Sequence, residues 1–180
     1  MSWFKKHGHW LLTLYVSFVF IQSLFFKFTG SPETVYIFQG KLDPWAASLG
    51  FPGLFAPGGI FSAKVVGSFE LIASILLLGS LVGNPALPAP DGRAVVPAEA
   101  RGVFAITRHP MMWAIALWGV AHILVYPVIA NIILSVAIII LSLVGAALQD
   151  SKKAALTPDS WPLWESRTSY WPFAAILAGR

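Results

Sequence analysis

The segment RGVFAITRHPMMWAIALWGVAHIL, residues 101–124, decides the fold of this chain. A short basic, polar segment at Thr107, Arg108 and His109 leads to Pro110 and to residues 110–126, 17 residues without a formal charge. Proline lacks a backbone N–H and is tolerated at the first helical position, so this step predicts the start of a helix. The first-turn N–H groups have no intrahelical acceptor and carry partial positive charge. Arg108 and His109 beside them are typical either of a ligand-binding corner or of interfacial anchors for a membrane helix.

The composition on both sides of this segment is that of a membrane protein. The chain has 180 residues, of which 57% are hydrophobic and 11% charged, against about 25% charged in ordinary soluble proteins. There are no cysteines, which excludes disulfides, thiolate catalysis and zinc–cysteine sites. A net charge of +4 requires no nucleic-acid partner. The expected partner is the lipid bilayer.

Four apolar runs predict an all-α integral membrane protein, a bundle of four transmembrane helices. They cover about residues 10–28, 62–82, 110–126 and 128–148. At ~1.5 Å per residue the third run is near the lower limit for crossing a ~30 Å hydrocarbon core. Tyr126-Pro127 predicts a tight turn, so the last two runs should form an antiparallel hairpin. Lys5 and Lys6 precede the first run without a cleavage pattern after it, which predicts an uncleaved anchor.

The basic residues predict the orientation of the four helices. In this arrangement one side carries nine of them: Lys5, Lys6, Arg93, Arg101, Arg108, Lys152, Lys153, Arg167 and Arg180. The other side has Lys27, Lys41 and Lys64. The positive-inside rule then places both termini in the cytoplasm. We expect a multi-pass protein of the bacterial cytoplasmic (inner) membrane.

Two pairs of polar residues lie inside the predicted helices. Glu70 should pair with Lys27 at similar depth, a structural role that we favour over a proton site. In a hairpin that turns at residues 126–127, residues whose numbers sum to 253 lie at equal depth, which brings His122 level with Asn131. A His–Asn hydrogen bond between the two helices, worth about 0.6–2 kcal/mol, would fix their rotation.

The first half of the chain, residues 1–83, contains two predicted helices and an outer interfacial loop rich in Gly, Pro and aromatic residues. SLFFKFTGSPETVYIF and, further on, GSFELIASILLLG carry its pattern. These motifs resemble DoxX-family membrane proteins over about residues 15–80. The resemblance implies a small helical membrane protein, of a kind in part associated with membrane oxidoreductases.

The second half, residues 103–180, follows a Pro-rich linker at residues 84–102. TRHPMMWAIALWGVAHIL, then QDSKKAAL, then W-x-x-x-T-S-x-x-PFAAILAGR occur in order to the C-terminus. From about residue 83 onward these motifs resemble the NnrU family. That resemblance implies an accessory or redox-linked protein of nitric-oxide and denitrification metabolism. The related zeta-carotene isomerases share the RHP and W-x-x-AH elements and are haem-dependent, which implies that His109 or His122 ligates haem b.

Helix geometry limits the haem hypothesis. His109 and His122 are 13 residues apart, hence ~20 Å apart along a helix and ~140° around it, and cannot both bind one iron. We therefore predict a haem or metal near the inner leaflet, held by His109 with His7 or His9 and Arg108 alongside. The aromatic tail after residue 156 should cover this corner.

Three other functions stay open on the sequence alone. One is a carotenoid cis–trans isomerase, and another is a non-catalytic assembly subunit in a homo-oligomer or membrane complex. A methyltransferase is less favoured, because the tail follows the NnrU pattern.

Overall fold

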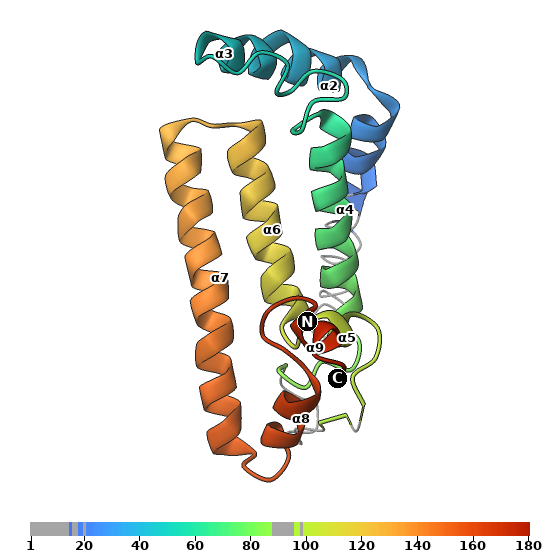
Figure 1. The fold of residues 1–180 in the computed structure, drawn as a ribbon, viewed down its shortest axis with the longest axis vertical. Helices are drawn as coiled ribbons and strands as arrows, with labels where there is room; N and C mark the ends of the chain where they lie inside the picture. The colour runs from blue at the N-terminus through green and yellow to red at the C-terminus, as the bar shows by residue number, and fades with distance from the viewer. Residues whose placement is uncertain (1–14, 16–17, 20, 88–95, 98) are drawn as a thin grey trace, which may run out of the picture.

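The computed structural model describes residues 15, 18, 19, 21–87, 96, 97 and 99–180, and within this part of the chain all regular structure is helical. Three long helices, α4 (Ala63–Gly79), α6 (Pro110–Val125) and α7 (Ile129–Leu156), lie side by side. The middle helix, α6, packs against both α4 and α7 (Figure 1). The predicted all-α class is therefore confirmed.

The end of the first predicted helix also lies in this bundle. Residues 21–29 are helical and run beside α4 (Figure 1). Most of the preceding residues of this run, including His7 and His9, lie outside the described residues. The charge pair described below joins this helix to α4.

The segment between the first helix and α4 is not the loop that the sequence suggested. It forms α2 (Pro32–Ile37), a π-helical turn η1 (Phe38–Leu42) and α3 (Asp43–Ser48). Ser31 caps α2, because its hydroxyl accepts a hydrogen bond from the Thr34 N–H, and prolines occupy the first turns of α2 and α3. Phe38 and Leu42 are buried against Phe55 and Val66, so this layer covers one end of the bundle (Figure 1).

The hairpin of α6 and α7 turns at residues 126–128, as predicted. Its helices approach closely at Gly119, where an added Cβ would lie 2.9 Å from a side-chain carbon of Ile139. The α7 helix continues to Leu156, past the predicted end at residue 148, because Gln, Lys, Ala and Leu, which are good helix formers, make up most of the residues that follow the apolar run.

The opposite end of the bundle is covered by the C-terminal tail. Short helices α5 (Val103–Ile106), α8 (Trp161–Arg167) and α9 (Ala174–Leu177) gather there (Figure 1). Trp161 and Trp164 are buried in one cluster with Phe104. The expectation that the tail docks beside Arg108 is confirmed, because the Arg108 N–H donates to the Ser169 carbonyl at 2.8 Å.

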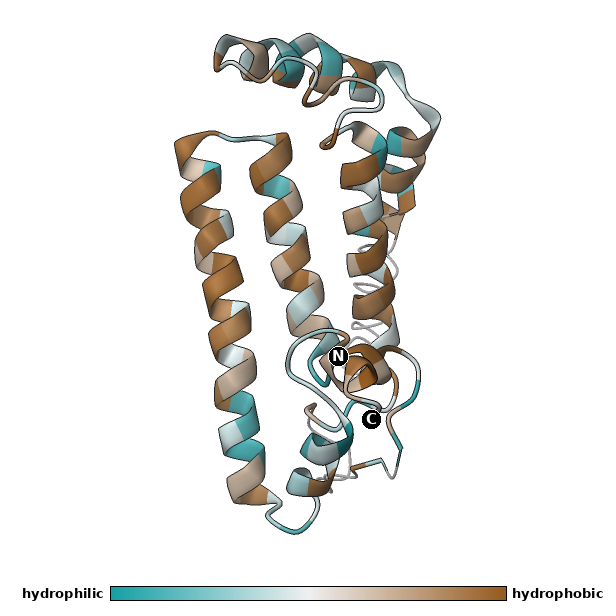
Figure 2. Cartoon of the chain, viewed as in Figure 1, coloured by the Kyte–Doolittle hydropathy of each residue, from teal (hydrophilic) through white to brown (hydrophobic). Residues whose placement is uncertain are grey.

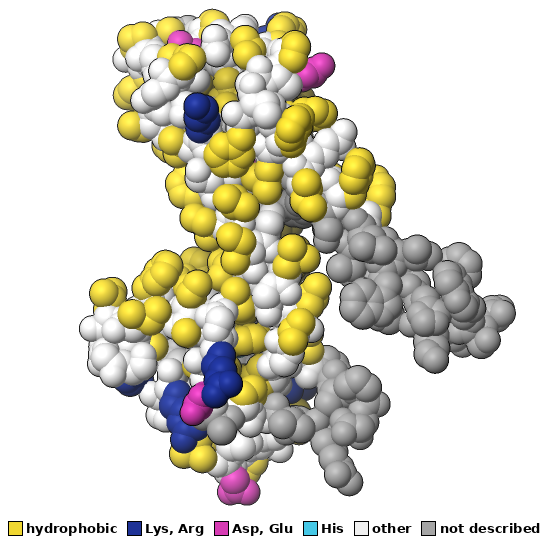
Figure 3. All heavy atoms as spheres, turned by 90° about the vertical axis from the view of Figure 1, so that its right-hand side faces the viewer, with side chains coloured by type: hydrophobic (Ala, Val, Ile, Leu, Met, Phe, Trp, Pro, Cys, Tyr) yellow, Lys and Arg dark blue, Asp and Glu magenta, His cyan; other side chains and the backbone are white. Residues whose placement is uncertain are grey.

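The outer surface of the three long helices is apolar. Among the described residues α7 is long and apolar enough to cross a membrane, whereas α6 is apolar but shorter. Figure 2 shows hydrophobic residues along most of α7 and hydrophilic ones near its lower end. Figure 3 shows charged side chains at the two ends of one face, with hydrophobic ones between. Large exposed apolar side chains on these helices include Ile72, Ile75, Leu78, Ile133, Leu134, Ile140, Leu141, Val144 and Leu148.

Candidate functional site

The step Thr107–Arg108–His109 is an extended connection between α5 and α6, held by the tail. Thr107 has extended backbone angles, and its buried hydroxyl donates towards the carbonyls of Ser169, at 3.2 Å, and Tyr170, at 2.8 Å. The helix then begins at Pro110 with His109 as its N-cap residue. The connection therefore directs two consecutive basic side chains towards α7.

Both side chains reach the same carboxylate. Arg108 Nε donates to Asp150 Oδ2 at 2.8 Å, and His109 Nε2 lies 2.8 Å from Asp150 Oδ1. Glu165 of α8 adds a longer contact of 3.5 Å to the Arg108 guanidinium. The His109 side chain is 1% exposed, and those of Arg108 and Asp150 are 14% and 12% exposed. We call Arg108, His109 and Asp150 the basic–acid cluster.

The surroundings keep Asp150 ionised. This residue lies two positions past the apolar run of α7, at its polar end. Burial acts to raise its pKa, but the hydrogen bonds that the carboxylate accepts from His109 and Arg108, together with the guanidinium charge of Arg108, outweigh burial, so the pKa lies below the usual 3.8. An ionised carboxylate with a basic partner on each oxygen satisfies the requirement that buried charges be paired.

Tyr170 closes the cluster from the side of the tail. Its hydroxyl donates to the Leu143 carbonyl at 2.6 Å, and its ring meets the His109 ring edge-on, with centroids 5.7 Å apart. The Trp113 indole N–H donates to the Tyr170 carbonyl at 2.9 Å. Burial and the charge of Asp150 raise the pKa of Tyr170 above 10.0, so its hydroxyl stays protonated at neutral pH.

The residues present around His109 do not fit a haem. Its Nε2 contacts Asp150, and its Nδ1 is buried without a hydrogen-bond partner among the described residues. The cavity that His109 lines has a volume of about 20 Å³, which is of the size of one water molecule and far below that of a porphyrin. No cluster of three or more His, Asp or Glu side chains able to hold a metal occurs in the described part of the chain.

His122 lies at the other end of α6, away from the basic–acid cluster. Its Nδ1 lies 2.9 Å from the Trp118 carbonyl, so its ring bonds within its own helix. Asn131 does lie at the same depth, but its amide donates to the backbone carbonyls of His122 and Tyr126, each at 2.8 Å. The predicted hydrogen bond between His122 and Asn131 therefore forms, but through the backbone carbonyl of His122 and not through its ring. The His122 and Tyr126 carbonyls each also accept a backbone N–H, from Tyr126 and from Val128 respectively, so Asn131 adds a second hydrogen bond to each and links the two helices across the turn.

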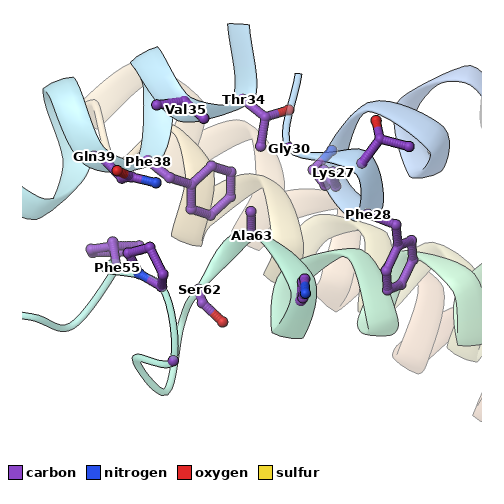
Figure 4. A pocket seen from close by; sticks show the side chains of 14 residues that line it. Lys27, Phe28, Gly30, Thr34, Val35, Phe38, Gln39, Phe55, Ser62 and Ala63 are labelled. Carbon is purple, nitrogen blue, oxygen red and sulfur yellow. The ribbon is translucent and has the colours of Figure 1, made fainter. Parts of the chain in front are cut away.

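Lys27 and Glu70 form an ion pair of 3.0 Å between the first helix and α4, and Ser23 bonds to both. Lys27 also lines a cavity of about 340 Å³ between α4 and the layer above it. Figure 4 shows Phe38, Phe55 and Ser62 among its lining residues. The pair thus lies at the opposite end of the molecule from His109.

A second, apolar cavity of about 410 Å³ lies between the first helix, α4 and α6. Ala73 and Leu77 line it from α4, and Ala114, Ile115 and Trp118 line it from α6. Tyr15 and Val19 complete the lining that is described. We call this cavity the apolar groove.

Sequence reasoning missed three members of the site, Asp150, Glu165 and Tyr170. The equal-depth rule places Asp150 level with residue 103 rather than with residues 108 and 109. That rule compares backbone positions at ~1.5 Å per residue and leaves out the reach of the Arg108, His109 and Asp150 side chains. The first acidic residue after an apolar run was the signal that could have suggested Asp150.

The fold and site define a class of protein: a helical bundle with an apolar outer surface and a basic–acid cluster buried at one end. Comparison with known families identifies the family to which the chain belongs. The family model described as "NnrU protein" matches residues 50–180. The chain belongs to the NnrU family. This match begins before the expected boundary near residue 83 and includes α4.

One curated relative is a maize (Zea mays) protein described as a chloroplastic 15-cis-zeta-carotene isomerase. It is 35% identical over 79 residues, which are 44% of this chain and 22% of the maize protein. The aligned part thus spans about a fifth of that relative. No solved structure matches the chain.

Proposed function

We propose that the chain is a multi-pass protein of the bacterial cytoplasmic membrane, with four spans and with both termini on the cytoplasmic side. The support comes from the apolar outer surface of α4, α6 and α7, and from the basic residues gathered at the end where α8 and α9 lie. In this arrangement the basic–acid cluster lies at the cytoplasmic boundary. The layer of α2, η1 and α3 covers the outer boundary.

Within that membrane we propose an isomerase-like activity on an extended, apolar polyene. The apolar groove carries this proposal, because its volume is within the range of ligand sites, about 300–1,000 Å³, and its lining is almost wholly apolar. The maize relative's described activity supplies the substrate class. The groove's side chains would hold the polyene between two helices and exclude water from it.

Product analysis tests this activity. Membranes containing the protein are incubated with 15-cis-zeta-carotene, and the isomers are separated by chromatography; we expect conversion to the 15-trans isomer. Ala73→Phe, or Leu77→Trp at the edge of the groove, should reduce conversion about tenfold or more. Leu141→Trp, on the exposed side of α7, is the control and should keep full activity. No conversion by the unaltered protein would overturn the proposal.

A second candidate is an accessory or redox-linked role in nitric-oxide and denitrification metabolism. The match to the NnrU family supports this candidate. Haem bound through His7 or His9 belongs to this candidate. The test is an absorption spectrum of the purified, haem-supplemented protein: a Soret band lost in the His7→Ala/His9→Ala variant supports it, and no Soret band contradicts it.

A non-catalytic assembly role, in a homo-oligomer or a membrane complex, is what remains if neither conversion nor a Soret band is found. The broad apolar face of α7 supports it as a surface for other membrane helices.

A further inference from the structure

His109 Nδ1 is the one buried ring nitrogen of the described histidines without a hydrogen-bond partner in this part of the chain. An unpaired polar atom at such a site is costly, and native structures usually pair it with protein or an ordered water. The two other unpaired buried nitrogens of the described residues, in Trp161 and Trp164, lie in an apolar cluster. Of these three nitrogens, that of His109 belongs to a residue that lines a cavity described above.

The contact at Nε2 determines what Nδ1 can offer. An ionised carboxylate accepts hydrogen bonds and cannot donate them. The 2.8 Å contact with Asp150 Oδ1 therefore requires a proton on Nε2. Arg108 holds the other Asp150 oxygen and so fixes the carboxylate in place. In the neutral ring Nδ1 then carries a free lone pair, which accepts a hydrogen bond.

The adjoining cavity has a volume of about 20 Å³, enough for one water molecule. Besides His109 it is lined by Asn84, Ala86, Leu87, Arg108, Met111, Met112 and Gln149. The first hydrogen bond of α6 runs from the Trp113 N–H to the His109 carbonyl, so the N–H groups of Met111 and Met112 precede the ladder and have no intrahelical acceptor. The cavity thus offers one acceptor and further polar partners to a small ligand.

We propose that Asp150 and Arg108 are positioning residues that hold His109 in the Nε2–H tautomer, and that His109 Nδ1 binds one small hydrogen-bond donor, a water molecule, in this cavity. This assignment makes the basic–acid cluster a buried polar ligand site instead of an iron-ligating one. It does not depend on the isomerase activity, and its test measures no conversion.

The chain contains its own reference histidine. His122 Nδ1 faces the Trp118 carbonyl at 2.9 Å, and a carbonyl only accepts. His122 must therefore carry its proton on Nδ1. The two described histidines are expected to be opposite tautomers in one protein.

Ring-nitrogen NMR of ¹⁵N-histidine-labelled protein in nanodiscs at neutral pH measures both tautomers directly. His109→Gln and His122→Gln assign the signals. We expect an unprotonated, hydrogen-bonded Nδ1 for His109 and a protonated Nδ1 for His122. A protonated Nδ1 at His109 would overturn the proposal.

Variants that fill the cavity test the bound water. Ala86→Val or Leu87→Phe, each at a residue that lines the cavity, should expel the water and shift the His109 Nδ1 signal to that of a nitrogen without a hydrogen bond. In both filled variants the His122 signals should stay unchanged. The control variant Ser151→Ala, on the exposed surface of α7, should leave the His109 signals unchanged. Asp150→Asn should give a mixture of His109 tautomers. An unchanged Nδ1 signal in both filled variants would show that no water is bound there.

Discussion

Asp150 binds a basic group with each of its carboxylate oxygens, and both basic groups come from the extended step before α6. Removing one partner of such a buried pair leaves the other charge uncompensated. We expect Asp150→Asn to lower the free energy of unfolding by about 3 kcal/mol, measured by denaturant titration in detergent. Arg101→Ala is the control: its pair with Glu99 is exposed, so the change should stay below about 1 kcal/mol. An equal loss of unfolding free energy in both variants would contradict the claim that burial makes the Asp150 contacts more stabilising than an exposed ion pair.

The same carboxylate predicts a pH dependence. Because the folded-state pKa of Asp150 is lowered, its stabilising contribution is fully present above about pH 4 and is lost as the pH falls through the folded-state value. The unaltered protein should therefore lose more thermal stability than Asp150→Asn between about pH 5 and 3. Parallel losses of Tm in the two proteins would show that Asp150 does not cause the acid sensitivity.

At the scale of single residues, the sequence was enough to identify Arg108 and His109 as candidate site residues, but not to identify their partner Asp150. A basic segment before Pro110 is visible in one short stretch of sequence, whereas its partner Asp150 lies 42 residues further along the chain and comes next to it only in the folded hairpin. Lys27 and Glu70 were easier to pair, because each is a lone charge in a regular apolar helix at similar depth.

At the scale of elements, the hairpin of α6 and α7 was predictable because a Tyr-Pro turn separates two apolar runs. The helices α2 and α3 were not, since Gly, Pro and aromatic residues are typical of loops as well as of short helices with prolines in their first turns. Phe38, Leu42 and Ala46 of this layer pack on Phe55 and Val66, and this packing stabilises its helical backbone. This is a tertiary contact that no local pattern shows.

Two glycines of the hairpin give a matched test of its packing. A Cβ at Gly119 would lie 2.9 Å from Ile139 and 3.3 Å from the Ser135 carbonyl oxygen, whereas a Cβ at Gly145 meets no atom within 4 Å. Gly119→Ala should lower the free energy of unfolding by about 1–3 kcal/mol through overpacking. Gly145→Ala should raise it by up to about 1 kcal/mol, because alanine favours the helix. The same unfolding titration measures both, and a reversed order would contradict this packing.

The tail is held by its buried tryptophans. Trp164 is 1% exposed and its ring meets Phe104 edge-on, whereas Trp171 is 62% exposed. Trp164→Ala should cost about 3–5 kcal/mol and release α8 and α9, detected as faster proteolytic cleavage after residue 156. Trp171→Ala is the control and should be cleaved at the original rate. Protection of the tail in both variants would argue against this anchor.

At the scale of the whole molecule, the apolar outer surface of the bundle separates two different polar ends. The outer end has Lys27, Glu70 and the layer formed by α2, η1 and α3; the other has the basic–acid cluster and the tail. Composition alone predicted the helical class. The orientation rests on the distribution of Lys and Arg, which is a property of the full sequence and not of any one contact.

The proposed topology is tested most directly by the accessibility of single cysteines, since the chain has no natural cysteine to remove. Ser48→Cys at the end of α3 and Ser166→Cys in α8 both replace exposed residues. In intact cells whose outer membrane has been opened, an impermeant thiol reagent should label residue 48, and it should label residue 166 only after the inner membrane is permeabilised. Labelling of both residues from one side, or in the reverse order, would contradict the membrane arrangement on which the account depends.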